Sequence, residues 1–267
     1  MKLKKNLLKI YPYENKKKVA KKQNKKMKRN SIKKNTKISV IIPCYNEKAT
    51  ISKIITKVSK VKINIEIIVV DDNSDDGSKK IIKNLKNKFI KKKIFHKKNL
   101  GKGACIRSAT KFVSGDIILI QDADLEYNPN DYYKLLKPFK FKNINAVYGS
   151  RVLNKKRFLL KASFPVNFRV FANLCLTFFS NIVNFQNLTD AHTCYKLVRS
   201  ELFKKLDLKE NDFSFCPELT TKLSNINEKI IEVPISYRGR SYSEGKKIGL
   251  YDAFKVIFVI FKYRLIF

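Results

Sequence analysis

The feature that most constrains the fold of this chain is an alternation of short apolar runs and amphipathic stretches between residues 38 and 121. The apolar runs, at 38–42, 63–70, 94–95 and 117–120, suit buried strands, and helices are expected at 47–58, 78–89 and 104–113. Strands that alternate with helices are typical of parallel sheets built from βαβ units. The sequence therefore predicts an α/β fold in which a mostly parallel sheet is flanked by helices.

The fourth strand ends in three carboxylates at alternate positions, Asp122, Asp124 and Glu126. In extended backbone, side chains at i, i+2 and i+4 point to the same side, so these three are expected to converge on one point. Such a point suits a hard divalent cation, Mg2+ or Mn2+, which proteins commonly bind through one or two carboxylates and the phosphates of a substrate. The alternative is an acidic loop that faces water at the end of a strand.

The first two strands also run into polar turns. The first is followed by the segment Pro43-Cys-Tyr-Asn-Glu47, in which Asn46 is expected to cap the next helix. The second ends in Asp71 and Asp72, whose carboxylates suit hydrogen bonds from a ribose or from the edge of a base. Because open α/β sheets bind ligands at the carboxyl ends of their strands, both turns are candidate parts of a binding site.

Two cationic side chains are also expected near the carboxyl ends of predicted strands. The segment 99–103, Asn-Leu-Gly-Lys-Gly, has glycines that let the backbone approach a ligand, and Lys102 would present a positive charge to a phosphate. Arg151 ends a strand predicted over 146–151, and its guanidinium suits a diphosphate. Neither signal is specific alone, since the glycine spacing is not that of a Walker motif.

Composition limits the class of protein. At 267 residues the chain is long enough for one large domain with tails. Its formal net charge of +36, from 58 Lys and Arg against 22 Asp and Glu, predicts an anionic partner, either nucleic acid or an anionic membrane surface. A nucleic-acid-binding protein is the alternative class, but the basic excess is spread along the chain without a recognisable motif, so no nucleic acid is expected. The five cysteines lack paired spacing, which favours reduced thiols in a cytoplasmic protein.

The two ends of the chain differ from its middle. Residues 1–36 form a Lys- and Asn-rich tract that is expected to be a disordered tail, and no signal peptide is recognisable. The folded domain is expected over 37–249. Residues 250–267 are apolar with interspersed basic residues and are too short to span a bilayer. They should form an amphipathic helix that lies on a membrane or docks on the core.

A second amphipathic helix is predicted over 164–185. Its polar stripe, at helical spacing, comprises Arg169, Asn173, Thr177, Ser180 and Asn184. The opposed apolar stripe comprises Phe164, Phe168, Phe171, Cys175, Phe178, Ile182 and Phe185. Such a helix suits a membrane interface, and the alternative is that its apolar stripe completes the core.

Six motifs carry a resemblance to a known family: the turns at 43–47 and 71–77, Asn99-x-Gly-Lys-Gly-x-Ala, Ser114-Gly-Asp, Asp122-Ala-Asp-Leu-Glu and Gly149-Ser-Arg. In this order, the chain resembles the family-2 nucleotide-sugar glycosyltransferases, and within them the dolichyl- or undecaprenyl-phosphate sugar synthase branch, which is dolichol-phosphate mannosyltransferase-like. The resemblance extends over about residues 38–249. It implies a glycosyltransferase-A fold, a Rossmann-like sheet flanked by helices, with amphipathic helices at a membrane interface.

The resemblance also implies roles for individual residues. The nucleotide-sugar donor is expected at Pro43, Tyr45, Glu47, Asp72, Lys102, Asp122 and Ala123. The metal is expected at Asp122, Asp124 and Glu126, although the branch often has Gln in place of this Glu. The catalytic group is expected to comprise Asp122, Asp124, Arg151 and Asp190. The acceptor phosphate is expected at Arg169, Arg238, Lys246 and Lys247, where the usual Ser-Lys pair reads Lys-Lys.

The acceptor decides whether a general base is needed. A lipid monophosphate arrives largely ionised, whereas a sugar hydroxyl must lose a proton. Asp190 matches the base of hydroxyl-accepting relatives, and here it is either that base or an electrostatic group beside the acceptor, with His192 as a rival base. The sequence therefore predicts a metal-dependent, inverting glycosyltransferase that moves a hexose from UDP or GDP to a polyprenyl phosphate, peripheral to the cytoplasmic membrane face. The alternative within the same fold is transfer to a glycan hydroxyl in cell-envelope polysaccharide synthesis.

Overall fold

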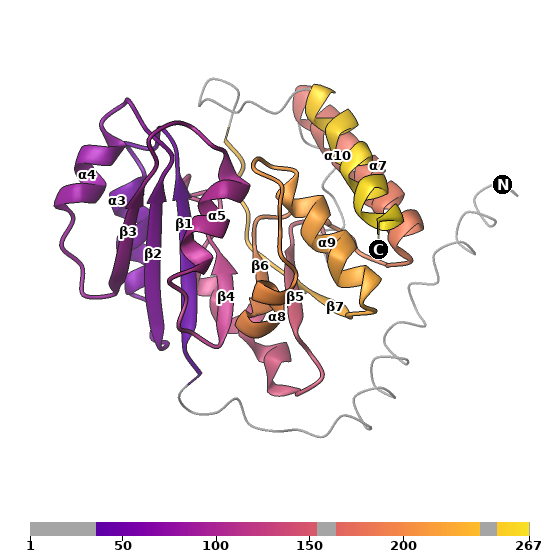
Figure 1. The fold of residues 1–267 in the computed structure, drawn as a ribbon, viewed down its shortest axis with the longest axis horizontal. Helices are drawn as coiled ribbons and strands as arrows, with labels where there is room; N and C mark the ends of the chain where they lie inside the picture. The colour runs from indigo at the N-terminus through magenta and orange to yellow at the C-terminus, as the bar shows by residue number, and fades with distance from the viewer. Residues whose placement is uncertain (1–35, 154–163, 241–249, 267) are drawn as a thin grey trace, which may run out of the picture.

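Seven strands form a single sheet in the order β3-β2-β1-β4-β6-β5-β7 (Figure 1). The structure, a computed structural model, describes residues 36–153, 164–240 and 250–266, without the side chains of 164–169 and 250–252. The strands are β1 Ile38–Cys44, β2 Ile65–Asp71, β3 Ile90–Phe95, β4 Ile117–Ile120, β5 Ala146–Ser150, β6 Lys196–Arg199 and β7 Ile230–Pro234. The helices are α3 Ile51–Ser59, α4 Ser78–Asn84, α5 Lys102–Thr110, η1 Pro129–Asp131, α6 Tyr132–Leu136, η2 Lys137–Lys140, α7 Phe164–Asn184, α8 Ser200–Lys205, α9 Phe215–Asn225 and α10 Leu250–Leu265.

The sheet is mostly parallel, as the alternation of strands and helices predicts. β1 pairs in parallel with β2 and β4, β2 with β3, and β5 with β7, while β6 runs antiparallel between β4 and β5. All of these strands except β6 therefore end at the same edge of the sheet. Helices flank the sheet, and the predicted α/β fold is confirmed (Figure 1).

The central strands supply the core. Every residue of β2 and β4 is buried, and so is every residue of β1 except the half-buried Pro43. A strand that is covered on both faces needs apolar side chains at consecutive positions, which is the pattern of these runs. At one edge of the sheet, β3 carries Lys91, Lys92 and Lys93, and charged side chains at an edge hinder pairing with another chain.

One predicted helix start is wrong. α3 begins at Ile51, behind Thr50, rather than just after Asn46. Asn46 has a left-handed backbone, φ 55°, which Asn adopts more readily than most residues. Its side-chain oxygen accepts a hydrogen bond from the Asp75 amide at 3.1 Å. Asn46 therefore ties the turn after β1 to the turn after β2 instead of capping a helix.

α7 and α10 lie side by side on one flank of the molecule, where the rings of Phe179 and Phe261 are 5.3 Å apart (Figure 1). The described part of the polar stripe of α7 faces inward, since Thr177, Ser180 and Asn184 are at most 3% exposed and Asn173 is half-buried. The apolar side chains on the outer side are 44% exposed or more: Phe171, Phe178, Ile182 and Phe185 on α7, and Phe254, Phe258, Phe261 and Leu265 on α10. We call these eight side chains the apolar face.

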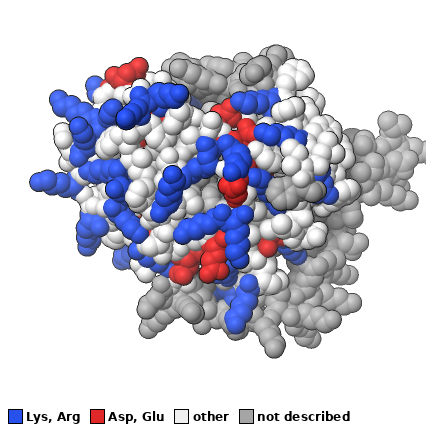
Figure 2. Space-filling view, viewed as in Figure 1, with Lys and Arg blue, Asp and Glu red and all other residues white. Residues whose placement is uncertain are grey.

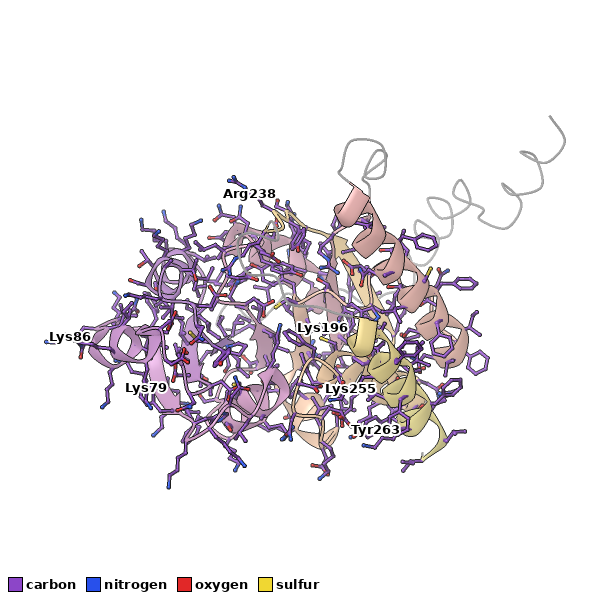
Figure 3. All side chains as sticks on the ribbon, turned by 90° about the horizontal axis from the view of Figure 1, so that it is seen from above. Lys79, Lys86, Lys196, Arg238, Lys255 and Tyr263 are labelled. Carbon is purple, nitrogen blue, oxygen red and sulfur yellow. The ribbon has the colours of Figure 1, made fainter. Side chains whose placement is uncertain are left out.

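The orientation of α7 answers a question that the sequence left open. The apolar stripe does not complete the core in the described part of this helix, because it points away from the protein. Figure 3 shows rings that project from the outer side of the two helices. Among the described residues, no helix is long and apolar enough to cross a membrane.

Candidate active site

The polar turns predicted from the sequence meet at the edge where the parallel strands end. The Asn46 amide donates to the Ser74 hydroxyl at 3.0 Å, and the Glu47 amide donates to the Ser78 hydroxyl at 2.8 Å. The turns after β1 and β2 therefore form one unit. Tyr45 lies on it with 45% of its surface exposed, so its ring is accessible to a ligand.

Lys102, the first residue of α5, forms an ion pair with Asp122. The loop before it is tightly packed: Gly101 has φ 93°, and a Cβ there would lie 2.6 Å from the carbonyl oxygen of Asn211. Only glycine fits such a position without strain. Burial disfavours the ammonium, but the Asp122 carboxylate raises the pKa of Lys102 above its ordinary value. Lys102 therefore stays charged beside the acidic residues that follow β4.

The three carboxylates after β4 do not converge as predicted. Leu125 has a left-handed backbone, φ 63°, so the chain turns after Asp124 instead of continuing extended. Asp124 accepts a hydrogen bond from the Glu126 amide at 3.0 Å within this turn. The prediction that all three side chains point to one side rested on extended backbone through Leu125, and that premise is wrong.

Asp122 and Asp124 remain as a pair of oxygen donors. Burial, followed by the charges of Asp122 and Glu126, raises the pKa of Asp124 to about 7. Closely spaced negative charge of this kind is relieved by a bound cation, and carboxylate oxygens are the ligands that Mg2+ and Mn2+ prefer. Ala123, between them, is buried. The two residues therefore fit a divalent ion that is also held by the phosphates of a substrate.

Glu126 anchors the segment that follows β7. Its carboxylate accepts hydrogen bonds from the Tyr237 hydroxyl and the Arg240 amide, both at 2.8 Å. Its carbonyl accepts a third from the Arg238 amide at 3.0 Å. Because the side chain is buried with these partners, the arrangement gives Glu126 no support as a metal ligand, and that role stays a prediction.

Arg240 is a functional candidate that the predicted site residues did not include, although it belongs to the basic segment after β7. Its guanidinium donates to both carboxylate oxygens of Glu47, at 2.9 and 2.6 Å, and to the Asp124 carbonyl at 3.1 Å. It therefore joins the turn after β1, the turn after β4 and the segment after β7. The sequence shows four basic residues between 238 and 247 but carries no signal of which one turns inward.

Arg151 and Asp190 form a buried ion pair. Arg151 donates to the two Asp190 oxygens through Nε at 2.7 Å and Nη2 at 2.8 Å, and its amide adds a third bond at 3.0 Å. Burial would raise the pKa of Asp190, but the Arg151 guanidinium lowers it below its ordinary value. A carboxylate held so firmly in its ionised form is a poor general base, because a base works best when its pKa lies near the operating pH.

The turn that carries Asp190 is fixed from the other side by Glu232, which accepts from the amides of Thr189 at 2.7 Å and Asp190 at 2.9 Å. Nearby, burial and then the charge of Lys196 lower the pKa of His192 to about 4. Its Nε2 is buried and has no hydrogen-bond partner among the described residues. Since this atom is out of reach of a ligand, His192 gains no support as a rival base.

Asp72 is 2% exposed and is occupied by protein groups. Its carboxylate accepts from the Leu100 amide at 3.0 Å and the Gly101 amide at 2.7 Å, and it pairs with His96 at 2.6 Å. Direct contact with a nucleotide therefore stays a prediction for this residue. Sequence reasoning missed His96, because a single histidine at the end of an edge strand carries no signal of its partner.

The predicted acceptor residues are described only in part. Arg238 is exposed, and Figure 3 shows its side chain projecting from the molecule. The Arg169 side chain, Lys246 and Lys247 lie outside the described residues. On the face seen in Figure 2, basic side chains are spread widely with acidic ones among them, rather than gathered in one stripe.

Comparison with known protein families and proteins identifies relatives of this chain. A family model described as glycosyl transferase family 2 matches residues 39–207. The chain is 27% identical over 229 residues to a dolichol-phosphate mannosyltransferase of Pyrococcus furiosus, covering 80% of this chain and 61% of that protein. It is 28% identical over 243 residues to a UDP-N-acetylglucosamine–dolichyl-phosphate N-acetylglucosaminyltransferase of Methanococcus voltae, covering 83% and 93%.

Solved structures support the fold. Glucosyl-3-phosphoglycerate synthase of Mycobacterium tuberculosis, in complex with Mn2+, uridine diphosphate and glucosyl-3-phosphoglycerate, is similar with a TM-score of 0.62 and 20% identity, covering 85% of this chain and 80% of that one. Mannosyl-3-phosphoglycerate synthase of Rubrobacter xylanophilus is similar with a TM-score of 0.65 and 17% identity, covering 85% and 72%. Identities this low show the fold alone, which is the glycosyltransferase-A fold.

Proposed function

Because this chain belongs to glycosyl transferase family 2 and is a glycosyltransferase, we propose that its donor is a UDP- or GDP-linked hexose and its acceptor a polyprenyl phosphate. The names of the two dolichol- and dolichyl-phosphate transferases support this acceptor class. The chain spans 61% of the length of the mannosyltransferase, so the acceptor also has to be argued from its own residues.

The observation that carries the lipid acceptor is the apolar face on α7 and α10. Soluble proteins rarely expose so many large apolar side chains together, and a patch of this kind marks a surface that binds a partner. The inward-facing polar stripe of α7 adds to the argument, because a water-facing helix would be turned the other way. Helices with rows of Phe on their outer side suit the boundary between headgroups and acyl chains.

The ion pair of Asp190 supports a phosphate acceptor over a hydroxyl. A hydroxyl acceptor needs a base that can take its proton, whereas Asp190 is held as a carboxylate by Arg151 and has no exposed surface. A phosphate monoester is largely ionised near neutral pH and needs positioning rather than deprotonation. In this proposal the pair shapes the acceptor side through its charge.

The reaction is proposed as a direct displacement. An oxygen of the acceptor phosphate forms a bond to C1 of the hexose while the bond from C1 to the nucleoside diphosphate breaks, and the electron pair leaves with the diphosphate. One displacement inverts the configuration at C1. A double displacement would need a free carboxylate as nucleophile, and Asp190, the acid that matches the family's base, is bound to Arg151.

Charge on the departing diphosphate has to be neutralised. We propose that Asp122 and Asp124 hold Mg2+ or Mn2+, which supplies positive charge at this point when bound. Lys102 lies beside Asp122, and Arg240 is fixed between Glu47 and the Asp124 carbonyl. These two cations would add positive charge near the phosphates, while the exposed Tyr45 ring could lie against the nucleotide. Arg169, Arg238, Lys246 and Lys247 stay proposals for the acceptor phosphate.

The place of action is proposed as the cytoplasmic face of the membrane, to which the protein binds peripherally. Nucleotide-sugars are charged and would enter from water, whereas a lipid acceptor would enter from the bilayer along α7, whose Asn173 side-chain amide donates to Asp190 at 3.3 Å.

The test is a transfer assay with the purified protein, Mn2+, labelled UDP-glucose or GDP-mannose, and undecaprenyl phosphate in detergent. Label should move into the organic phase with one donor, and should stay in water with the Asp124→Asn variant or after chelation. Label that stays in water with every donor would refute the lipid acceptor. The competing acceptor, a glycan hydroxyl, would show as transfer to soluble sugars that vanishes in Asp190→Asn, whereas a lipid-phosphate enzyme should retain part of its rate.

A further inference from the structure

We infer that His96 and Ser108 are positioning residues that act through Asp72 on the loop that carries Lys102. The effect on transfer rests on the proposed function, whereas the effect on the loop can be measured without any substrate. The three residues come from different elements: Asp72 follows β2, His96 follows β3, and Ser108 lies in α5.

The contacts form one continuous chain. His96 Nδ1 is 2.6 Å from Asp72 Oδ1, and His96 Nε2 is 2.9 Å from Ser108 Oγ. An ionised carboxylate can only accept, so Nδ1 carries the proton that Asp72 binds. In the neutral imidazole Nε2 then accepts from the Ser108 hydroxyl, which fixes both the tautomer and the ring orientation. His96 and Asp72 are almost fully buried, so water does not compete with this chain of hydrogen bonds.

Asp72 links these hydrogen bonds to the loop before Lys102. Its two oxygens accept from the amides of Leu100 and Gly101, which directly precede Lys102. On its other side the loop is pressed against the 210–211 backbone, where the Ala104 amide donates to the Asn211 carbonyl at 2.9 Å. The loop is therefore clamped between Asp72 and Asn211. This clamp sets where the Lys102 ammonium meets Asp122.

The same residues include a group that has the composition of a metal site. One ligand atom each from Asp72, His96 and Cys105 lies within 4.8 Å of the others, and all three residues are buried. Two ligands of one tetrahedral zinc ion would be about 3.3 Å apart, given metal–ligand distances near 2.0 Å. The 2.6 Å separation of Asp72 and His96 is instead that of a hydrogen bond, and Cys105 Sγ is 4.0 Å from Nδ1. The geometry favours hydrogen bonding, and metal binding becomes an outcome of the test.

A matched pair of substitutions separates the two ring nitrogens. In His96→Asn the side-chain amide takes the position of the imidazole Nδ1 and can still donate to Asp72. In His96→Gln the amide takes the position of Nε2 and cannot reach Asp72. Hydrogen–deuterium exchange at Leu100 and Gly101 should stay close to wild type in His96→Asn and rise about tenfold in His96→Gln, as a local opening would. Ser108→Ala should raise it less, in the same direction. Thr110→Val is the control, because the Thr110 hydroxyl donates to the Ile106 carbonyl within α5 and has no other hydrogen-bond partner in the part of the chain that the structure describes.

With the donor, the KM should rise about tenfold in His96→Gln while kcat changes less, by analogy with residues that orient metal ligands, whose loss typically costs 10–100-fold in metal affinity or activity. Raised exchange without any transfer in wild type would refute the proposed function and leave the positioning role intact. Loop exchange that is equal in His96→Asn, His96→Gln and wild type would overturn the inference. It would also be overturned if Co2+ added to the protein gave a thiolate absorption band that Cys105→Ser abolishes.

Discussion

At the scale of single residues, the partners of each acid decide what it can do. Glu126 binds the segment after β7, and Asp190 is paired with a buried guanidinium. Asp124 differs, because burial and then the charges of Asp122 and Glu126 raise its pKa, and among the described residues no cationic side chain pairs with its carboxylate. Of these three acids, it is the one whose environment calls for a positive ligand.

The first prediction concerns the Asp190 carboxylate. Asp190→Asn removes the charge that the buried Arg151 guanidinium needs, so the free energy of unfolding should fall by about 3–5 kcal/mol, as for other broken buried pairs. Urea denaturation followed by circular dichroism measures this loss. The double variant Arg151→Met with Asp190→Leu should lose much less than the two single variants together, since no charge is then left unpaired.

Asp207→Asn serves as the control, because Asp207 and its partner Lys209 are both largely exposed, and no measurable change is expected. If Asp190→Asn were as stable as wild type, the pair would not contribute as the structure indicates. The activity of Asp190→Asn is informative only at temperatures where the variant is folded, which the same denaturation curves establish.

At the scale of elements, the orientation of α7 is where sequence reasoning reached its limit. The helical period predicted the helix correctly from Phe164 to within one residue of its end, and it predicted the two stripes correctly where the side chains are described. It did not predict which stripe faces inward, because a water-facing helix and a membrane-facing helix have the same periodicity. Burial of Thr177 and Ser180 against the rest of the protein is a tertiary property.

The second prediction tests the apolar face. Phe178→Glu combined with Phe258→Glu places one charge on an exposed position of each of α7 and α10, so binding to lipid vesicles should weaken at least tenfold, given roughly 1.5–3 kcal/mol for each buried large apolar side chain. Vesicle flotation measures the binding, and the melting temperature should stay unchanged because neither ring is buried. Phe112→Glu, on the chain just after α5, is the control for an exposed Phe elsewhere. Equal flotation of both variants would contradict a lipid-binding role.

Features that depend on local sequence were predicted, and features that depend on contacts between distant residues were not. The first five strands were predictable from their apolar runs, whereas β6, β7 and the order of the strands in the sheet were not predicted. The Asp-x-Asp turn was found in the right place but with the wrong geometry, since a left-handed Leu125 has no marker in the sequence. Contacts such as Asp72 with His96 and Arg240 with Glu47 join residues 24 and 193 positions apart, and spacing alone does not pair them.

At the scale of the whole molecule, the candidate site lies at the carboxyl ends of the parallel strands, and a hydrogen-bond network ties the strands together near their amino ends. Glu66 is the centre of this network. It is almost fully buried and accepts hydrogen bonds from the Ser39 hydroxyl at 2.6 Å, the Ser114 amide at 2.8 Å and the Ser114 hydroxyl at 2.6 Å. Lys37 adds an ion pair at 2.6 Å. These bonds join β1 and β2 to the segment before β4.

The third prediction is the pH dependence of this network. Burial would raise the pKa of Glu66, but the bonds from Lys37, Ser114 and Ser39 lower it from 4.5 to about 2. The stabilisation is therefore complete above pH 4.5 and is lost as the pH falls toward 2. Glu66→Gln should lose roughly 2 kcal/mol of unfolding free energy at pH 7, and the difference from wild type should shrink steadily below pH 4. Urea denaturation across this range checks it, with Glu201→Gln, an exposed acid on α8, as control. A difference that stays constant with pH would contradict the assigned cause.

The last prediction uses the net charge of +36 to separate a lipid surface from nucleic acid. Either polyanion should bind this protein at low salt, and both interactions should weaken by an order of magnitude or more from 0.1 to 0.5 M salt, because added ions screen the charges. The apolar face distinguishes them, since it contributes to binding only where acyl chains can bury it. Flotation with vesicles of 30% anionic lipid should therefore persist in part at 0.5 M salt and be lost there in the Phe178→Glu and Phe258→Glu variant. Binding to duplex DNA, measured by fluorescence anisotropy, should vanish at that salt for both proteins. If DNA binding survived 0.5 M salt and displaced the protein from vesicles, the nucleic-acid class would gain and the membrane proposal would fall.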